Sequence, residues 1–176
     1  YLIVNAKHQD NKDEKHQIAL FSSQKSNSMA MSYISGDEVQ KQHELIGKYK
    51  VIMGKVVPRG GEVGVDPSVG YRVTSTLQVL SPGSVFTDSY LLLAAFDSKA
   101  EAIHFAEYMC LKFPRFLLHE TYSSMNISKQ NFRFVPFLDY SKEWTDKELF
   151  KRYGCNEEEI SMIESIIRPM EYVFHE

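Results

Sequence analysis

Apolar and polar positions alternate along much of the first half of the chain with the period of a β-strand. The clearest case is 72–80, RVTSTLQVL, which fits a half-buried strand. The segment 90–95 within an expected strand at 89–96 is almost wholly apolar, which predicts a central strand covered on both faces. Similar patterns predict further strands at 1–6, 17–22, 49–57 and 131–136.

The second half of the chain follows mainly the period of a helix. Ser98 with Glu101 forms a capping box, and apolar residues at helical spacing continue to Phe113. Pro114 then predicts a bent or restarted helix. Two short helices are expected further on, from two more capping boxes and a terminal glycine: Thr145 with Glu148, Asn156 with Glu159, and Gly154.

These patterns predict an α+β fold, with a mixed or antiparallel sheet and a helical C-terminal half. A length of 176 residues suits one domain. We expect strands and loops mainly in 1–95, with a helix at 37–46, and helices mainly in 96–176. The chain begins with tyrosine rather than methionine, so we expect it to be a fragment of a larger protein.

Composition describes an ordinary globular chain and excludes several classes. There are 23 acidic residues against 20 lysines and arginines, and 43% of the residues are hydrophobic. Two cysteines without a CxxC motif form neither a disulfide framework nor a zinc site. No apolar run approaches the roughly 20 residues that span a bilayer, so we expect a cytoplasmic protein without a membrane partner.

Charge is distributed unevenly along the chain. Five basic residues and one acid lie between Lys41 and Arg59, whereas ten acids and five bases follow from Asp139 onward. A locally basic surface on a net acidic protein suits the attraction of phosphates by lysine and arginine, although solvated surface gives the same pattern. A loop with four glycines, 60–70, follows the basic stretch and is expected either to approach phosphates or to form a turn.

The order of motifs in the second half resembles one enzyme family. A strand ending AAFD leads to EAIHFAEYMCLKFPRFLL, then NFRFVP, WTDKELFKRYG and EEEISMIESIIRPM. This series resembles the end of Eco57I-like restriction-modification enzymes, which are adenine-specific DNA methyltransferases, some of them fused to an endonuclease. The resemblance is strong over about 96–170 and weaker over 47–95. It implies a target-recognition domain that follows the catalytic domain.

That resemblance implies that the chain reads double-stranded DNA beside the catalytic methyltransferase domain of the same protein. Lysine and arginine contact phosphates, and asparagine side chains pair with adenine in the major groove. We expect DNA contacts from Lys50, Lys55, Arg59, Arg72, Lys129, Asn131 and Arg133.

Neither a catalytic residue nor a metal-ligand set is predicted from the sequence. The adenine-pocket motif, Asn or Asp followed by Pro-Pro and an aromatic residue, does not occur, nor does a glycine-rich turn for S-adenosylmethionine. We expect no cofactor in this fragment, whereas the parent would use S-adenosylmethionine, and Mg²⁺ if a nuclease is fused. An autonomous nuclease is disfavoured, because the acids near Lys41 lack the required spacing and strand context.

The main alternative is a protein-protein docking module between the methyltransferase and endonuclease parts. Its interface would use aromatic residues for which a place in the core is the favoured interpretation: Phe132, Phe134, Phe137, Tyr140 and Trp144. Retention on heparin and a duplex-DNA shift assay at two salt concentrations would separate the two classes.

Overall fold

The computed structural model of the protein describes residues 10–22, 31–39, 41–56, 70–122 and 127–176. The expected strand at 1–6 and most of the glycine-rich loop lie outside these ranges.

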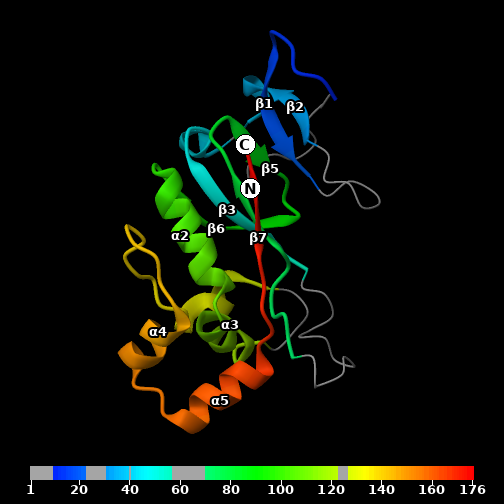
Figure 1. Ribbon diagram of the computed structural model, residues 1–176. Helices are drawn as coiled ribbons and strands as arrows, with labels where there is room; N and C mark the ends of the chain where they lie inside the picture. Colours follow the sequence, from blue (N-terminus) through cyan, green and yellow to red (C-terminus); the bar gives the residue numbers. More distant parts are fainter. Residues whose placement is uncertain (1–9, 23–30, 40, 57–69, 123–126) are drawn as a thin grey trace.

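A four-stranded mixed sheet forms the centre of the molecule (Figure 1). Its order is β6-β3-β4-β7, with β3 antiparallel to both neighbours and β7 parallel to β4. The strands are β3 (Tyr49–Gly54), β4 (Leu77–Leu80), β6 (Tyr90–Phe96) and β7 (Tyr172–His175). Strands at 49–57 and 89–96 are therefore confirmed with shorter bounds, whereas only the second half of 72–80 is a strand.

A second, smaller sheet contains three strands in the order β2-β1-β5. They are β1 (His16–Phe21), which confirms the strand expected at 17–22, together with β2 (Met31–Ser35) and β5 (Ser84–Phe86). β1 is antiparallel to β2 and parallel to β5. In Figure 1, β1 and β2 lie at one end of the molecule, and the last three helices lie at the other.

Four α-helices occupy the second half, as expected. They are α2 (Lys99–Cys110), α3 (Lys112–His119), α4 (Asp146–Tyr153) and α5 (Glu157–Ile166). The side chains of Thr145 and Asn156 cap α4 and α5 in complete capping boxes, and Gly154 ends α4 at φ 70°. The predicted α+β class and its helical C-terminal half are confirmed.

The helix restarts just before Pro114. Leu111 is extended, with φ −63° and ψ 157°, and separates α2 from α3. Pro114 lies in the first turn of α3, where its missing N–H group is not needed. Two N–H groups of this turn, those of Lys112 and Phe113, donate to the Asp146 carboxylate at 3.0 and 2.8 Å.

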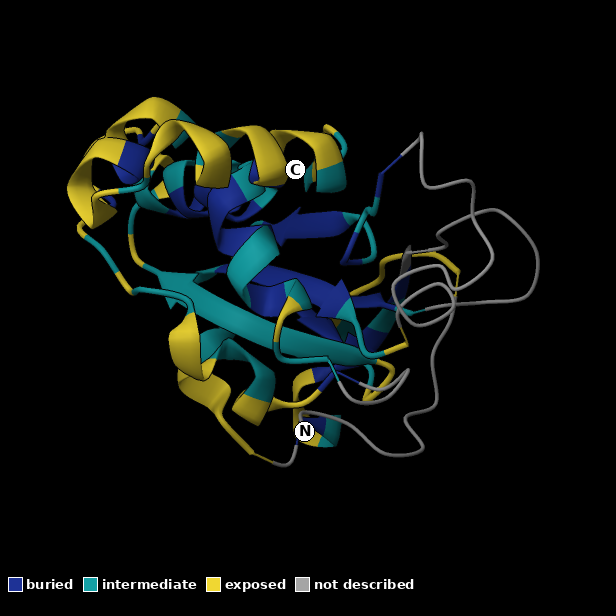
Figure 2. Ribbon diagram, turned by 90° about the horizontal axis from the view of Figure 1, so that it is seen from below, coloured by how far each residue is buried: buried dark blue, intermediate teal, exposed yellow. Residues whose placement is uncertain are grey.

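Side chains alternate between two cores on opposite faces of the large sheet. On β3, Val51 and Met53 join the core that contains α2, while Ile52 joins the core that contains β1 and β2. Figure 2 shows this burial as dark blue strands, with the outer helices mostly yellow. The three layers are therefore helices, the large sheet and the small sheet.

Three local predictions are wrong. The expected strand at 131–136 is instead the 3₁₀ helix η4 (Lys129–Phe134), in which Asn131 and Ser128 form a capping box. The expected helix at 37–46 is two 3₁₀ turns, η1 (Gly36–Glu38) and η2 (His43–Leu45). The apolar strand β6 is not central, because it lies at the edge of its sheet.

Candidate nucleic-acid interface

A close backbone contact joins the segment before β4 to the segment before β7. The N–H of Tyr71 donates to the carbonyl of Ile166 at 2.6 Å, and the N–H of Arg168 donates to the carbonyl of Tyr71 at 3.1 Å. Gly70 makes the approach possible: its φ is +72°, and a Cβ atom there would lie 2.8 Å from the Ile166 oxygen. The contact brings Arg72 and Arg168 into one region.

The backbone beside Arg72 is strained. Val73 has φ 72° and is 1% exposed, a conformation that a β-branched side chain rarely adopts. The hydroxyl of Tyr122 donates to the Val73 carbonyl at 2.6 Å and helps to hold this conformation. Strained residues cluster at functional sites, so this outlier motivates a functional hypothesis for the segment.

Arg115 anchors the same segment from inside the protein. Its side chain is fully buried and donates to the carbonyls of Cys110 and Leu111 at the end of α2, and at 3.1 Å to the carbonyl of Arg72. Among the described residues it forms no ion pair within hydrogen-bonding distance. Burial lowers the pKa of Arg115 to about 10, so it carries a positive charge at neutral pH.

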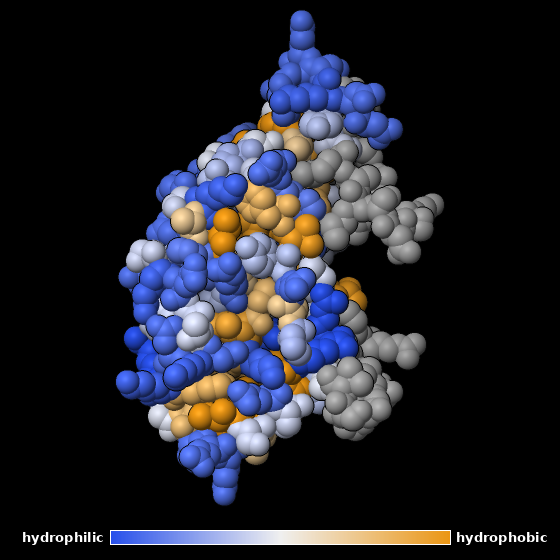
Figure 3. All heavy atoms as spheres, viewed as in Figure 1, coloured by the Kyte–Doolittle hydropathy of each residue, from blue (hydrophilic) through white to orange (hydrophobic). Residues whose placement is uncertain are grey.

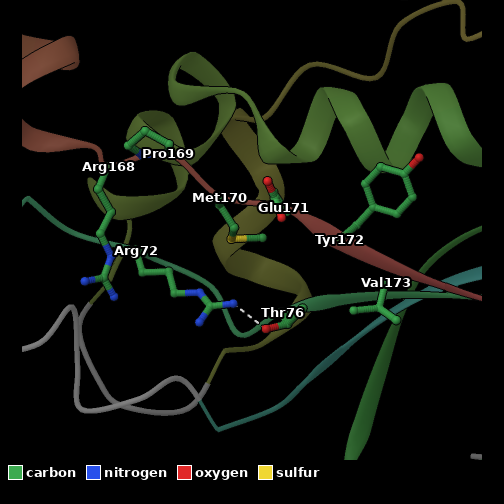
Figure 4. A pocket seen from close by; sticks show the side chains of 8 residues that line it. All are labelled: Arg72, Thr76, Arg168, Pro169, Met170, Glu171, Tyr172 and Val173. Atoms are coloured by element: carbon green, nitrogen blue, oxygen red, sulfur yellow. Dashed lines mark hydrogen bonds between the residues drawn. The ribbon is translucent and has the colours of Figure 1, made fainter.

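Arg72 and Arg168 line one open pocket of about 470 Å³ at the start of β4 and β7. Figure 4 shows both side chains on the same side of the segment that leads into β7. One terminal nitrogen of Arg72 donates to the hydroxyl of Thr76. The remaining lining residues run along this segment: Pro169, Met170, Glu171, Tyr172 and Val173.

The chemistry of this pocket suits an oxyanion. A guanidinium presents a planar fork of N–H donors that matches phosphate or carboxylate oxygens. The arginines influence one another, since Arg72 and Arg168 both lower the pKa of Arg115. The Asp146 carboxylate raises the pKa of Arg115, and Glu171 also lines the pocket, so carboxylates offset part of this positive charge. A bound anion would reduce the repulsion that remains. We therefore take the pair Arg72 and Arg168 as the candidate phosphate-contacting site and call it the arginine pocket.

The structure removes Lys50 from the predicted DNA contacts. Lys50 is 0% exposed, and its ammonium donates to the carbonyls of Lys48, Leu45 and Ser81 at 2.6, 2.9 and 3.4 Å. Burial lowers its pKa to about 8. These hydrogen bonds hold the side chain inside, so its charge serves the fold and cannot reach a phosphate.

The other predicted residues are divided between regions. Lys55 follows β3 and accepts a backbone hydrogen bond from Ile127 at 3.2 Å, and Arg59 lies outside the described residues. Lys129 and Arg133 are exposed on η4 and line a different hollow, beside β6. Of the predicted residues that the structure describes, Arg72 alone lines the arginine pocket.

Asn131, the residue predicted to read adenine, is engaged within the fold. Its carboxamide oxygen accepts from the N–H of Ser128 at 2.8 Å, and its nitrogen donates to the carbonyl of Thr121 at 2.9 Å. The Ser128 hydroxyl also donates to this oxygen at 3.0 Å, so both of its lone pairs are occupied and a bidentate pair with adenine would require one of these bonds to break. We therefore assign Asn131 a structural role.

Arg168 and Arg115 were missed by the reasoning from sequence. Both lie inside motifs of the family resemblance, KFPRFLL and IRPM, but spacing along the chain gives no sign that they approach Arg72. The proline after Arg168 was a usable signal, because it ends the helix and directs the chain back along the sheet.

One group of possible metal ligands lies elsewhere. The side chains of His104, Glu107 and Glu143 have potential ligand atoms within 4.8 Å of one another. His104 also interacts with the carbonyl of Tyr140 at 2.9 Å and with Glu143 at 3.9 Å. The contacts of His104 with this carbonyl and this carboxylate account for the geometry, so we assign no metal role to the group.

Comparisons with known proteins leave the chemistry of the site as the main guide to function. No family model, no curated protein and no solved structure matches the chain. Within the described ranges, none of the helices combines the length and apolar character that crossing a membrane requires.

Proposed function

We propose that this chain is a DNA-recognition module in which the arginine pocket contacts the phosphate backbone. The observation that carries the proposal is the convergence of Arg72 and Arg168, from segments far apart in sequence, on one pocket. A strained valine, a glycine that permits close approach and a buried arginine all hold this arrangement. Such a costly local structure is more readily explained by binding than by folding alone.

The resemblance to Eco57I-like enzymes supports a place for this module in a larger protein. There it would hold duplex DNA against a methyltransferase domain that binds S-adenosylmethionine, and an Mg²⁺-dependent nuclease where one is fused. Phosphate contacts would fix the register of the module on the duplex, while other groups read the bases. The arginine pocket is assigned only the first of these tasks.

The test is the salt dependence of binding to duplex DNA, measured by fluorescence anisotropy in the full-length parent. Each phosphate contact contributes about 0.9 to the slope of log affinity against log salt. Replacing Arg72 and Arg168 together with alanine should reduce that slope by nearly 2 and weaken binding to all sequences by a similar factor.

A matched control removes the same charge elsewhere. Lys151 and Arg152 are exposed on α4, and replacing both with alanine should change the slope much less. If the two double variants behave alike, or if the pocket variant keeps the wild-type affinity and slope, the arginine pocket does not contact DNA.

A further inference from the structure

The edge strand β6 lacks two of the usual protections of an edge, charge and proline, and its pairing with β3 is irregular only between Val51 and Ile52. It has seven residues, YLLLAAF, without charge or proline, whereas exposed edges in natural proteins are usually blocked by one of these devices. Every residue of β6 is of intermediate exposure, as the teal ribbon in Figure 2 shows. Among the described residues, 91–96 form backbone hydrogen bonds to β3 alone.

A groove of about 730 Å³ runs beside this edge. Its sides come from β6, from α2 and from the segment that starts with η4, and most lining residues are apolar. The apolar members include Leu91, Leu93, Phe105, Met109, Val135 and Phe137. Hydrophobic patches, coloured orange, also lie over the middle of the molecule in the view of Figure 3.

The wall opposite β6 is fixed in place although its outer aromatic ring is exposed. Phe137 is 74% exposed, yet its ring meets Tyr140 edge to face with centroids 5.1 Å apart. The hydroxyl of Tyr108 donates to the carbonyl of Pro136 at 2.8 Å. Because these contacts tie the wall to α2, the groove is preformed.

The charged residues that line the groove are all positive. Lys129 and Arg133 are the only lining residues that carry a charge at neutral pH, and both are exposed on η4. The guanidinium of Arg133 lies 4.7 Å from the ring centre of Phe134, which limits its freedom. A ligand that fits the groove should therefore combine apolar groups with negative charge near η4.

We propose that β6 and this groove bind an extended polypeptide segment, which pairs with β6 as a fifth strand. Its alternate side chains are apolar and enter the groove, and acidic residues at one end meet Lys129 and Arg133. A second copy of the chain fits less well, because its own β6 brings no acidic residue. This surface is separate from the arginine pocket and does not depend on the proposed DNA contact.

The probe is a fluorescein-labelled decapeptide of alternating valine and threonine that ends in two aspartates. It should bind the chain and shift the NMR signals of the β6 amides rather than those of β1 or β2. Two versions, methylated at the odd or at the even backbone nitrogens, test strand pairing, because only one set of amides faces β6 in a given register. One version should lose at least tenfold in affinity, and the other should bind nearly as well as the parent peptide.

Two variants test the side chains. Phe137→Asp places a negative charge at the apolar wall and should weaken binding at least tenfold, whereas Met162→Asp, on the exposed face of α5, should not. Arg133→Glu should weaken binding of the aspartate peptide and improve binding of a peptide with lysines at that end. Such a reversal would not follow from a folding defect.

The proposal is overturned by any of three results. These are no binding at about 1 mM peptide, equal effects of both methylation patterns, or shifts located away from β6. Self-association that Phe137→Asp abolishes would assign the groove to a second copy instead. Phe137→Asp should also leave the DNA salt slope unchanged, which separates a failure here from a failure of the DNA proposal.

Discussion

The two edges of the four-stranded sheet, β6 and β7, have opposite surroundings. β7 has four residues and is flanked by charge, with Arg168 and Glu171 before it and Lys99 over the Phe174 ring at 4.4 Å. β6 has seven apolar residues and faces an apolar groove. One sheet thus offers two chemically distinct surfaces, and the comparison suggests a division between anion binding at β7 and polypeptide binding at β6.

The largest expected effect concerns the buried arginine behind the β7 edge. Arg115→Ala removes a hydrogen-bond donor from the carbonyls of Cys110, Leu111 and Arg72. We expect a loss of about 3 to 5 kcal/mol in the free energy of unfolding, from unsatisfied polar groups and a cavity. Urea denaturation measures it, with exposed Arg152→Ala as a control that should cost about 0.5 kcal/mol or less. Equal costs for both variants would show that Arg115 does not hold the β7 edge.

The next effect concerns Lys50, on the strand between the edges. Its pKa falls from the ordinary 10.5 to about 8 on folding, so between these values the unfolded chain binds a proton that the folded chain has released. Stability should therefore rise with pH across that window, by about 3 kcal/mol relative to Lys50→Met. Below pH 8 the difference in unfolding free energy between the wild type and Lys50→Met should not change with pH. Lys147→Met, at an exposed position, should show no such pH dependence. If the stability difference between the wild type and Lys50→Met does not change with pH either, Lys50 is solvated in the folded protein.

A smaller effect should come from Gly70, which permits the close backbone contact beside the arginine pocket. Gly70 and Gly83 both have positive φ, +72° and +80°, but only Gly70 has a backbone oxygen where a Cβ would lie. Gly83→Ala should cost about 1 kcal/mol from backbone strain alone. Gly70→Ala should cost at least about 1 kcal/mol more and should weaken DNA binding. If thermal denaturation shows that Gly70→Ala and Gly83→Ala lose the same amount of stability, the close contact at Gly70 does not hold the arginine pocket in place.

The smallest expected effect lies at the β6 edge. Phe137→Ala removes an exposed ring whose main contact is the edge-to-face pair with Tyr140. Such pairs contribute about 0.5 to 1.5 kcal/mol, so the free energy of unfolding should fall by no more than about 1.5 kcal/mol. A loss above about 3 kcal/mol would indicate that Phe137 belongs to the core, and the apolar character of the β6 edge would then serve folding.

Local signals predicted the helical half well. The side chains of Thr145 with Glu148 and of Asn156 with Glu159 satisfy N–H groups within three residues, so no distant contact was needed to predict them. The prediction for 131–136 was wrong for a related reason. Alternating apolar residues suggested a strand, but the Ser128 and Asn131 capping box favours the 3₁₀ helix.

Long-range contacts explain the remaining differences. No local pattern shows that β6 lies at an edge or that Lys50 faces inward, because both depend on which strands pair. The arginine pocket is the clearest case, since Arg72 was predicted to contact phosphate while its neighbour Arg168 was not. The chain order of these residues contains no information about the bridge between Tyr71 and Ile167 that aligns them.

The parallel pairing of β4 with β7 also constrains how the protein folds. Leu77 pairs with Tyr172, so the chain must close a loop of more than half its length before these strands meet. The entropy of that closure is lost before any contact of β7 is gained. We expect the antiparallel pair of β1 and β2 and the capped helices to form early in refolding. The ability to bind an anion between Arg72 and Arg168 should emerge only in the last kinetic phase.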